Sequence, residues 1–518
     1  MKKDFMSKIL SVSLATLMLI PALISCGKPQ DGNGTDAPGS SSSDTTPAVT
    51  RPTVDADGYL LDNIPEDLDF GGEKVTVLYW QDSFSDEFTA ESGNTDITLD
   101  AIFRRNSVVE DRIGIKYDWV GIKGNNSNRN NYIDTAQNSI KTDTKAYDIL
   151  AGYSMCIANL SSQGLLRDLN TVNYIDTSMP WWPERLVSEA TIDGSLYFAS
   201  GDISTNMLWS MLFLIYNKDL MKELNMTEDM NRLVEDKKWT LSKLEEMCRN
   251  VYADNDGVEG KSDGDRFGLM TSNVYSDAFF FGCGLHTVEL NDKKQPMISE
   301  SFGSEKTHDV IVRLLNLFDS PDAQLYTKNY GNTTQFTQNN SLFEVRQPLY
   351  IRKSIAPTQT SFGVLPMPLY NEDQQSYVTT IGFTYTLYAI PQDTDKVDAA
   401  AATIECQASE AYRKTTPAIF EVCLKVKYAS DFESGRMFDI IRDGVTFDLG
   451  RMFCLDFSSG STKYATYNLF RHSLVNKKPE WASTYAVEKP ALESDLARIL
   501  DAFAAAKKMI PPAGQSKG

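Results

Sequence analysis

The stretch "EKVTVLYW" (73–80) decides the fold, because it is rich in β-branched and aromatic residues and follows a Gly-Gly turn. The next segment, "ITLDAIFRRNSVVEDRIG" (97–114), has apolar residues at helical spacing and ends in glycine, and a second strand pattern, "IKYDWV" (115–120), follows it. A helical pattern over 133–140 and a continuous apolar run, "YDILAG" (147–152), repeat the alternation. This alternation predicts a parallel sheet with helices on both faces.

A second α/β body is expected further along the chain. "WSMLFLIYNKDLMKEL" (209–224) passes from an apolar strand into a helix, and Trp239 precedes a Thr240 N-cap with Leu244 placed as a hydrophobic staple. Further strands are predicted at 361–368 and 383–391, and further helices at 310–318, 397–408 and 492–503. The chain contains no internal repeat and is too long for a single sheet, so we predict an α/β protein with more than one sheet.

The first residues have the features of a bacterial lipoprotein leader. Three lysines within residues 2–8 precede an apolar run over 9–23, which is shorter than the roughly 20 residues of a membrane span and fits the core of a signal peptide. "LISC" (23–26) resembles a lipobox, which implies removal of residues 1–25 and lipid on the sulfur of Cys26. The alternative is an ordinary signal peptide followed by a chance cysteine.

Residues 26–57 are rich in Gly, Ser, Thr, Asp and Pro, a composition that offers little to bury. We expect this segment to be a flexible leash. Acyl chains on Cys26 would hold the body at the membrane, because each buried methylene contributes about 0.8 kcal/mol. The predicted location is therefore the extracytoplasmic side of the cell membrane.

Composition argues against several kinds of partner. The chain carries a formal charge of −20, and loss of residues 1–25, with their three lysines and one aspartate, leaves about −22. That charge argues against nucleic acid and against an anionic lipid surface as partners. The six cysteines besides Cys26 are widely spaced and lack a CxxC pair, which argues against zinc and leaves disulfides or buried thiols open for Cys156, Cys248, Cys283, Cys406, Cys423 and Cys454.

An ordered set of stretches over about residues 73–510 resembles the extracellular solute-binding proteins of ABC importers, in the carbohydrate group related to maltose-binding protein. "IYNKDL" (215–220) after a strand, followed by a Trp-Thr helix start, is a recurrent pattern of that family. The other stretches that carry the resemblance are "GLLRDLN" (164–170), "MPWW" (179–182), "DGSLYFASGDIS" (193–204), "LFLIYNKDLMKELNM" (212–226), "KWTLSKLEEM" (238–247), "FGVLPMP" (362–368) and "EAYRKTTPAIFEVCLKVKYASD" (410–431).

The resemblance implies a two-lobed, type II periplasmic-binding-protein-like fold, in which each lobe is a mostly parallel sheet flanked by helices. It implies crossovers near 201–209, near 364–366 and after the helix of 396–408. The expected divisions are lobe 1 at 58–204 plus 367–410, lobe 2 at 205–366 plus 411–510, and a tail at 511–518. It also implies a non-enzymatic, monomeric receptor without a cofactor, which captures a small solute, an oligosaccharide first of all, by hinge closure and delivers it to the membrane subunits of an importer.

A sugar presents apolar faces to aromatic rings and hydroxyls to carboxylates, amides and guanidinium groups. In doubly wound sheets such ligands bind beyond the carboxyl ends of strands. That rule, applied to the strand ends, the first crossover and the late strand, nominates Trp80, Gln81, Asp82, Tyr153, Asp202, Trp209 and Phe383. Three further candidates are Trp181, Trp182 and Arg346, and for all ten a packing, capping or salt-bridge role is the alternative.

Other functions stay open as alternatives. A lipid-anchored glycoside hydrolase needs only two carboxylates at a suitable separation, and 70 acidic residues do not exclude such a pair. A helical-repeat glycan-capture lipoprotein is disfavoured by the apolar parallel strands. The Asp- and Gly-rich segment 253–268 resembles a calcium loop, but in an EF-hand alignment Tyr252 falls at the first ligand position, so we expect a solvated turn and no metal.

Overall fold

The structure, a computed structural model, describes residues 54–83, 85–327, 334–355, 357–420, 432–453 and 466–509. The chain divides into two units, Met1–Arg51 and Pro52–Gly518, and every described residue belongs to the second. The predicted leader, the lipidated Cys26, nearly all of the leash, Cys423, Cys454 and the tail at 511–518 lie outside the described residues.

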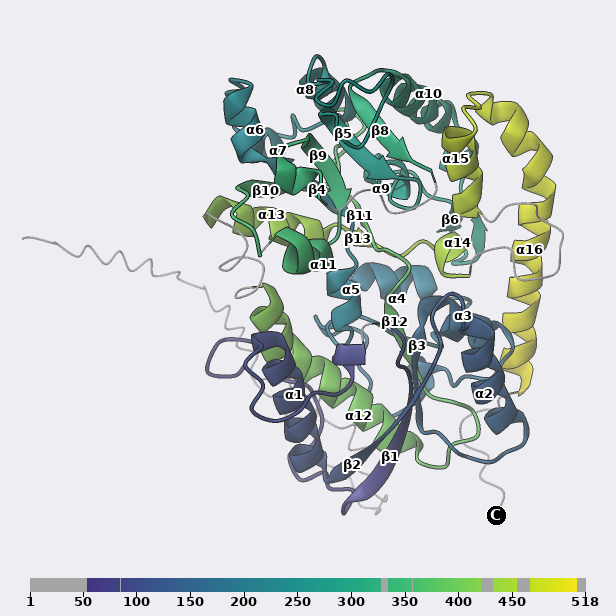
Figure 1. The fold of residues 1–518 in the computed structure, drawn as a ribbon. Coiled ribbons are helices and arrows are strands. Elements are labelled where there is room, and N and C mark those ends of the chain that lie inside the picture. Colours follow the sequence, from purple (N-terminus) through teal and green to yellow (C-terminus); the bar gives the residue numbers. More distant parts are fainter. Residues whose placement is uncertain are drawn as a thin grey trace, which may run out of the picture. The chain divides into compact units, whose positions relative to one another are not determined.

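The first sheet has the strand order β12-β3-β1-β2 (Figure 1). Strands β1 (Glu73–Trp80), β2 (Ile115–Ile122) and β3 (Ile149–Tyr153) run parallel, and β12 (Thr386–Ala389) pairs antiparallel with β3. Helices α1 (Ile97–Ile113) and α2 (Arg129–Lys141) connect the parallel strands. The predicted strand–helix alternation in this half of the chain is confirmed.

Helix α1 begins and ends where local chemistry requires. The Asp96 side chain accepts hydrogen bonds from the backbone N–H groups of Thr98 and Leu99, which satisfies two of the donors left unpaired at a helix start. Gly114 ends the helix with φ of 63°, and a Cβ there would lie 1.7 Å from a carboxylate oxygen of Asp69. Both the backbone conformation and the close contact require glycine at this position.

The second sheet has the order β10-β4-β9-β5-β8. Strand β5 (Phe267–Ser272) is parallel to both β8 (Ala323–Tyr326) and β9 (Ser341–Arg346). Strand β4 (Phe213–Asn217) is antiparallel to β9 and to β10 (Phe362–Leu365), so this sheet is more mixed than the pattern predicts. The reason is that β4 enters the second sheet directly from the first crossover rather than from a helix of its own lobe.

The crossovers explain how two sheets arise from one chain. The chain leaves the first sheet after β3, enters the second at β4, and returns between β10 and β12. The sequence predicts a strand from residue 209, whereas the structure places a short helix, α5 (Thr205–Trp209), in this crossover and starts β4 four residues later. Helix α12 (Val397–Glu410) packs on α1 in the first lobe, and α13 (Phe432–Asp443) packs on β10 in the second.

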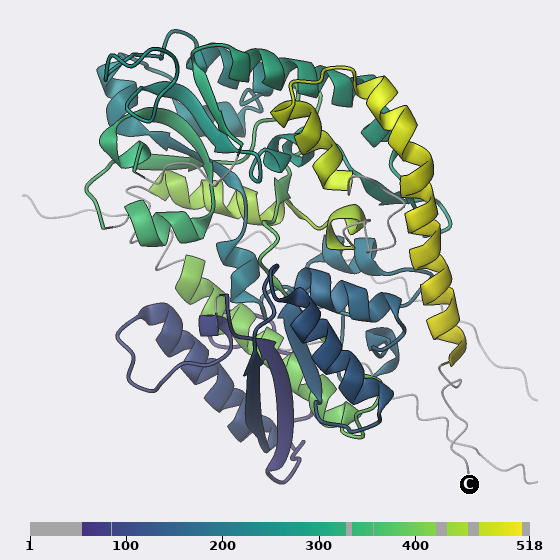
Figure 2. The same ribbon diagram turned by 45° about the vertical axis from the view of Figure 1, so that its right-hand side comes forward.

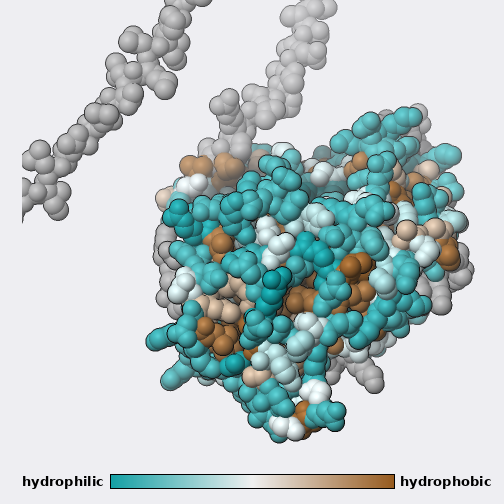
Figure 3. All heavy atoms as spheres, turned by 90° about the horizontal axis from the view of Figure 1, so that it is seen from above, coloured by the Kyte–Doolittle hydropathy of each residue, from teal (hydrophilic) through white to brown (hydrophobic). Residues whose placement is uncertain are grey.

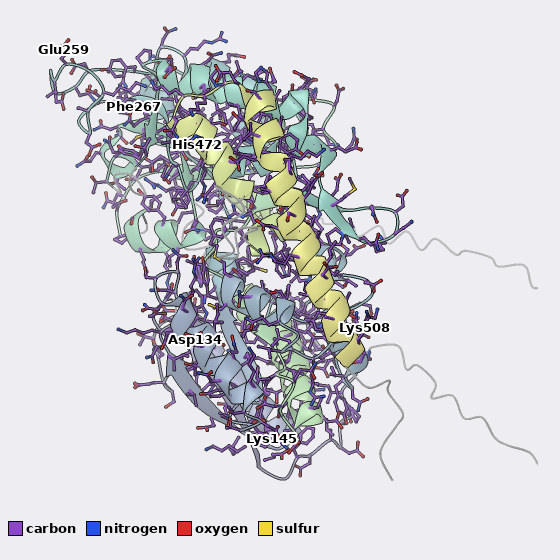
Figure 4. The ribbon with its side chains drawn as sticks, turned by 90° about the vertical axis from the view of Figure 1, so that its right-hand side faces the viewer. Asp134, Lys145, Glu259, Phe267, His472 and Lys508 are labelled. Atoms are coloured by element: carbon purple, nitrogen blue, oxygen red, sulfur yellow. The ribbon has the colours of Figure 1, made fainter. Side chains whose placement is uncertain are left out.

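The C-terminal helix α16 (Trp481–Met509) contacts both lobes, although the sequence assigns it to lobe 2 alone. It packs on β7 (Pro296–Ile298) and α10 (Glu305–Asp319) beside the second sheet and on α3 (Ser154–Ser162) beside the first. Figures 1 and 2 show it passing from one to the other, and Figure 4 shows it descending from the level of His472 to Lys508. The buried Trp481 indole donates to the Phe302 carbonyl at 2.7 Å and anchors the first turn.

The remaining elements are short helices within loops, short strands outside the two large sheets, and helices that cover the sheets. They are η1 (Ser85–Glu87), η2 (Leu169–Thr171), α4 (Glu184–Ala190), α6 (Lys218–Glu223), α7 (Met230–Glu235), α8 (Leu241–Cys248), α9 (Asp277–Gly282), β6 (Val288–Leu290), η3 (Glu300–Gly303), η4 (Phe336–Gln338), α11 (Pro348–Tyr350), η5 (Ile351–Ile355), β11 (Thr379–Thr380), η6 (Ala411–Thr415), β13 (Val445–Thr446), α14 (Leu449–Met452) and α15 (Thr466–Val475). The predicted Thr240 cap is confirmed, because its hydroxyl accepts from the Lys243 N–H.

The surface is polar on the face shown in Figure 3, and the four described cysteines are buried. Viewed from above the second sheet, the face is mostly hydrophilic, with hydrophobic atoms in small separate patches (Figure 3). Cys156, Cys248, Cys283 and Cys406 are buried free thiols, which is one of the two alternatives left open by the sequence. Each helix within the described ranges is too short or too polar to cross a bilayer.

Candidate ligand-binding site

A pocket of about 540 Å³ lies between the two lobes, on the side of the first sheet where β1 ends. One wall comes from the loop after β1 and the start of α1, the floor comes from α5, and the other wall comes from α11 and η5 after β9. Its lining residues are Ser83, Asp86, Glu87, Thr98, Ile102, Thr205, Asn206, Trp209, Leu349, Arg352 and Lys353. Because both lobes and a crossover contribute, this interlobe pocket changes shape whenever the lobes move. Its volume is within the usual range for a small-molecule site.

Glu87 fixes the inner wall of the interlobe pocket. Its side chain is buried and accepts hydrogen bonds from the Asn206 backbone N–H at 2.6 Å, the Ser204 hydroxyl at 3.1 Å and the Tyr388 hydroxyl at 2.7 Å. Burial raises the pKa of the Glu87 carboxyl, although the donors from Tyr388 and Asn206 oppose the shift. Glu87 therefore joins the loop after β1 to the first crossover and to β12, the strand that follows the second.

The opposite wall of the pocket contacts its floor through Arg352. The guanidinium lies over the Trp209 ring, 5.2 Å from its centroid, and Nη2 donates to Oδ2 of Asp96 at 2.6 Å. Burial alone would raise the pKa of Asp96, but the Arg352 hydrogen bond and charge and the N–H groups at the start of α1 outweigh it, and the pKa is lowered. Asp96 is therefore ionised at neutral pH.

This arrangement combines the two chemistries that a carbohydrate needs. The indole of Trp209, which is 4% exposed beneath the Arg352 guanidinium, lines the pocket with Leu349 and Ile102, and carboxylate, amide, hydroxyl and cationic groups surround them. Aromatic faces stack on apolar sugar faces, and polar groups of these kinds form hydrogen bonds with sugar hydroxyls.

Trp209 alone among the ten predicted ligand residues, all of them described, lines the interlobe pocket. Trp80 is fully buried, donates from Nε1 to the Thr386 hydroxyl at 3.0 Å, and packs its ring 5.3 Å from that of Tyr153, which is 2% exposed. Gln81 is exposed beside them. Neither of the two rings presents an open face in this structure.

Asp82 organises the loop before α2. Its carboxylate accepts from the backbone N–H groups of Gly124 and Asn125, at 2.9 and 3.0 Å, and from the Asn128 amide at 2.9 Å. Asp82 therefore has protein partners in this structure, and its role in ligand binding stays a prediction.

Trp181 and Trp182 bind a buried carboxylate of their own lobe. Their indole N–H groups donate to Oε1 and Oε2 of Glu405 on α12, each at 3.0 Å. Burial raises the pKa of Glu405 to about 8, and the two indole donors reduce that shift without cancelling it. Both rings are at most 2% exposed, so neither presents an open face here, and the role of either ring in ligand binding stays a prediction.

Asp202, Arg346 and Phe383 have protein partners. Asp202 is buried and its carboxylate accepts from Arg442 at 2.8 Å, while Arg346 donates to Glu344 within β9 at 2.7 Å. The Arg451 guanidinium covers the Phe383 ring at 4.0 Å from its centroid. Asp202 thereby joins the first crossover to α13, and together with Arg442 it also lines a pocket of about 370 Å³, whereas Arg346 is paired within its own strand.

Sequence reasoning missed the residues that build most of the pocket, among them Asp86, Glu87, Asn206 and Arg352. The strand-end rule reached the loop after β1 but stopped at Asp82. Applied to the parallel strand at 341–346, the same rule would have nominated the segment that contains Arg352.

The Asp-rich loop is a separate feature far along the second sheet. Carboxylate oxygens of Asp254, Asp256 and Asp265 lie within 4.8 Å of one another, a spacing that suits a cation. The loop's own groups already use them, since Ser262 donates to Asp256 at 2.5 Å and Tyr252 donates to Asp265 at 3.3 Å. Among the described residues, this is the one group of three or more carboxylate, histidine or cysteine side chains at metal-binding distance. The expectation of a solvated turn without a metal stays a prediction.

Comparison with known proteins identifies the architecture. No protein-family model and no curated protein sequence matches the chain. Solved structures do match. A cyclic α-maltosyl-1,6-maltose binding protein from Arthrobacter globiformis aligns with a TM-score of 0.55 at 15% identity, over 83% of this chain and 99% of its own. The chain has the two-lobed fold of the sugar-binding proteins of ABC transporters.

Two further structures extend this likeness to the solute-binding fold. A cyclo/maltodextrin-binding protein complexed with maltotetraose aligns with a TM-score of 0.52 at 13% identity, over 85% of this chain and 99% of its own. The galacto-N-biose/lacto-N-biose I-binding protein of an ABC transporter from Bifidobacterium longum aligns with a TM-score of 0.51 at 12% identity, over 84% of this chain and 98% of its own. The predicted two-lobed α/β fold is confirmed, and at these identities the likeness establishes the fold alone.

Proposed function

We propose that this protein is a non-enzymatic, lipid-anchored receptor that captures an oligosaccharide for an ABC importer. The single observation that carries the proposal is the interlobe pocket, in which a tryptophan face and a polar rim are supplied by both lobes and by the α5 crossover. The solute-binding fold supports it, because the aligned proteins include ones that bind maltotetraose and lacto-N-biose.

The pocket lining supports capture by lobe closure. A ligand that touches the loop after β1, α5 and η5 together interacts with more groups when the lobes approach one another, so it favours the closed state. Closure also excludes water, and hydrogen bonds to the sugar hydroxyls become stronger in the drier site. Glu87 transmits the position of the β1 loop to the crossover through its bonds to Ser204 and Asn206.

The anchor and the partners are part of the same proposal. The lipobox at 23–26 and the leash support attachment through Cys26, and membrane subunits of an importer would read the closed form of a monomeric receptor. Cys26→Ser in cells should release the protein from the membrane fraction and abolish incorporation of labelled fatty acid. Equal labelling of the variant would refute the anchor without bearing on the pocket.

The experiment that tests capture is a thermal-shift and calorimetric screen of the chain from residue 27 onward against a glycan panel that includes maltotetraose and lacto-N-biose. We expect a rise in melting temperature with at least one glycan and recovery of that glycan unchanged. Trp209→Ala should weaken binding at least tenfold, because stacking of a sugar ring on an aromatic face contributes about 1 kcal/mol or more together with the buried area.

The control variant is Trp119→Ala, which removes a half-buried tryptophan of β2 that stacks on Tyr117 and is absent from the pocket lining. It should lower stability and leave affinity unchanged. Equal loss of affinity in both variants would contradict the pocket assignment. Appearance of new reducing ends with time would instead support the glycoside hydrolase alternative.

A further inference from the structure

Arg352 contacts Asp96 and Trp209, and these three side chains are called the Arg352 bridge. The bridge joins three separate parts of the chain. Arg352 belongs to η5, beyond the carboxyl end of β9 in the second lobe. Asp96 is the N-cap of α1 in the first lobe, and Trp209 ends α5 in the crossover. The bridge therefore joins the two lobes at the interlobe pocket, which Arg352 and Trp209 line and whose α1 wall begins with Thr98, two residues after Asp96.

Both contacts of Arg352 are of kinds that a sugar would make. A guanidinium over an indole, here 5.2 Å from the ring centroid, occupies the flat face on which an apolar sugar face stacks. The 2.6 Å bond to Asp96 occupies a carboxylate oxygen two residues before the pocket-lining Thr98, and carboxylate oxygens are acceptors for sugar hydroxyls. Trp209 is only 4% exposed, so a ligand cannot stack on it while the guanidinium is in place.

We propose that Arg352 is an internal competitor for the ligand: in the ligand-free protein it occupies the Trp209 face and the Asp96 carboxylate, and a captured glycan must displace it. This inference rests on the proposed function, but its first consequence concerns the ligand-free chain. Arg352 thereby sets affinity and selectivity, because only a ligand that replaces both the stacking contact and the carboxylate contact recovers what its displacement costs.

The bridge is suited to displacement rather than to permanent structure. The Arg352 and Asp96 side chains are 19% and 36% exposed, so water and salt reach their ion pair. The buried pair of Arg451 and Asp277 in the same protein differs, with exposures of 6% and 2%. A partly exposed pair contributes little net stability and can open without leaving an unpaired buried charge.

The ligand-free test measures how well acrylamide quenches Trp209 fluorescence. The other tryptophans are at most 2% exposed except Trp119, so subtracting the signal of a Trp209→Phe background isolates the ring of interest. Arg352→Ala should raise the quenching constant of Trp209 at least twofold. Salt at about 1 M should raise it in the wild type and not in the variant, because it screens the ion pair.

The control is Arg104→Ala, which removes an ion pair on the same helix α1, to Asp100 at 2.7 Å, from a side chain that is 74% exposed. It should change neither quenching nor its salt dependence. If the acrylamide quenching constant of Trp209 is the same in Arg352→Ala as in the wild type, the guanidinium does not shield Trp209. The inference is then wrong, whatever the protein binds.

The ligand arm uses maltotetraose, or the best glycan of the panel if maltotetraose does not bind. Arg352→Ala should bind it about fivefold to tenfold more tightly, as expected for removal of one cation–π contact and one partly exposed ion pair. Weaker binding by the variant would overturn the competitor role and make Arg352 a direct ligand contact. Increased quenching without binding of any glycan would refute the proposed function while the bridge itself stands.

Discussion

Replacing Glu405 by glutamine should remove a pH dependence of stability that the wild type carries. Glu405 is 1% exposed in α12 and accepts both tryptophan N–H groups of the "MPWW" stretch. Burial raises its pKa from 4.5 to about 8, so the folded protein holds a proton on this carboxyl over a range in which the unfolded chain has released it.

The sign and size follow from proton linkage. Because the folded-state pKa is the higher one, the contribution of Glu405 to stability is fully present below about pH 4.5 and is lost as the pH rises towards 8. Between pH 5 and pH 8 the free energy of unfolding should fall by about 3 kcal/mol relative to a variant without the proton site. For a body of this size, that corresponds to a decrease of roughly 3 °C in melting temperature.

The assay is differential scanning calorimetry of wild type and Glu405→Gln at a series of pH values from 5 to 8. All other titrating groups are shared, so the difference between the two melting temperatures isolates Glu405. Glu259→Gln, which removes a carboxylate from an exposed loop at the far tip of the second lobe, is the control and should show no such trend (Figure 4).

A difference that stays constant from pH 5 to pH 8 would refute this reasoning. It would mean that Glu405 is ionised throughout, so that the two indole donors stabilise the charge more than burial disfavours it. A slope of the opposite sign would mean that the folded-state pKa lies below the unfolded value.

Three further variants test other parts of the structure. Glu87→Gln keeps one acceptor oxygen but sets an amide NH2 against either the Asn206 N–H or the Tyr388 hydroxyl, so it should cost about 1–3 kcal/mol of unfolding free energy, measured by denaturant titration, and weaken glycan binding. Gly201→Ala should cost more than about 3 kcal/mol, because φ is 145° and a Cβ would lie 2.2 Å from the Trp181 carbonyl, whereas Gly194→Ala, with φ of 81° and open space, should cost about 1 kcal/mol. Trp481→Phe keeps an aromatic ring, although a smaller one, and loses the donor to the Phe302 carbonyl, so hydrogen exchange in the first turn of α16 should speed up about fivefold or more. Unchanged exchange would mean that packing alone anchors α16.

Local sequence determined the elements of the first lobe. The β-branched run of β1, the apolar periodicity of α1 and its stop at Gly114 are properties of contiguous residues, and each was predicted from its own segment. The Thr240 cap is of the same kind. Such features depend on steric preferences and hydrogen bonds within a few residues, which is why a single sequence reveals them.

The sequence by itself therefore determined the α/β class, the two-lobed fold and the existence of strand ends where a ligand could bind. Only the tertiary structure decided which side chains line the interlobe pocket. The sequence nominates Trp181 and Trp182 for the ligand site, and the structure shows their N–H groups bonded to Glu405 of α12, more than 220 residues away. Arg352 and Asp96, 256 residues apart, meet across the pocket for the same reason. The direction of a side chain depends on partners brought together by the whole fold, and spacing along the chain carries no record of them.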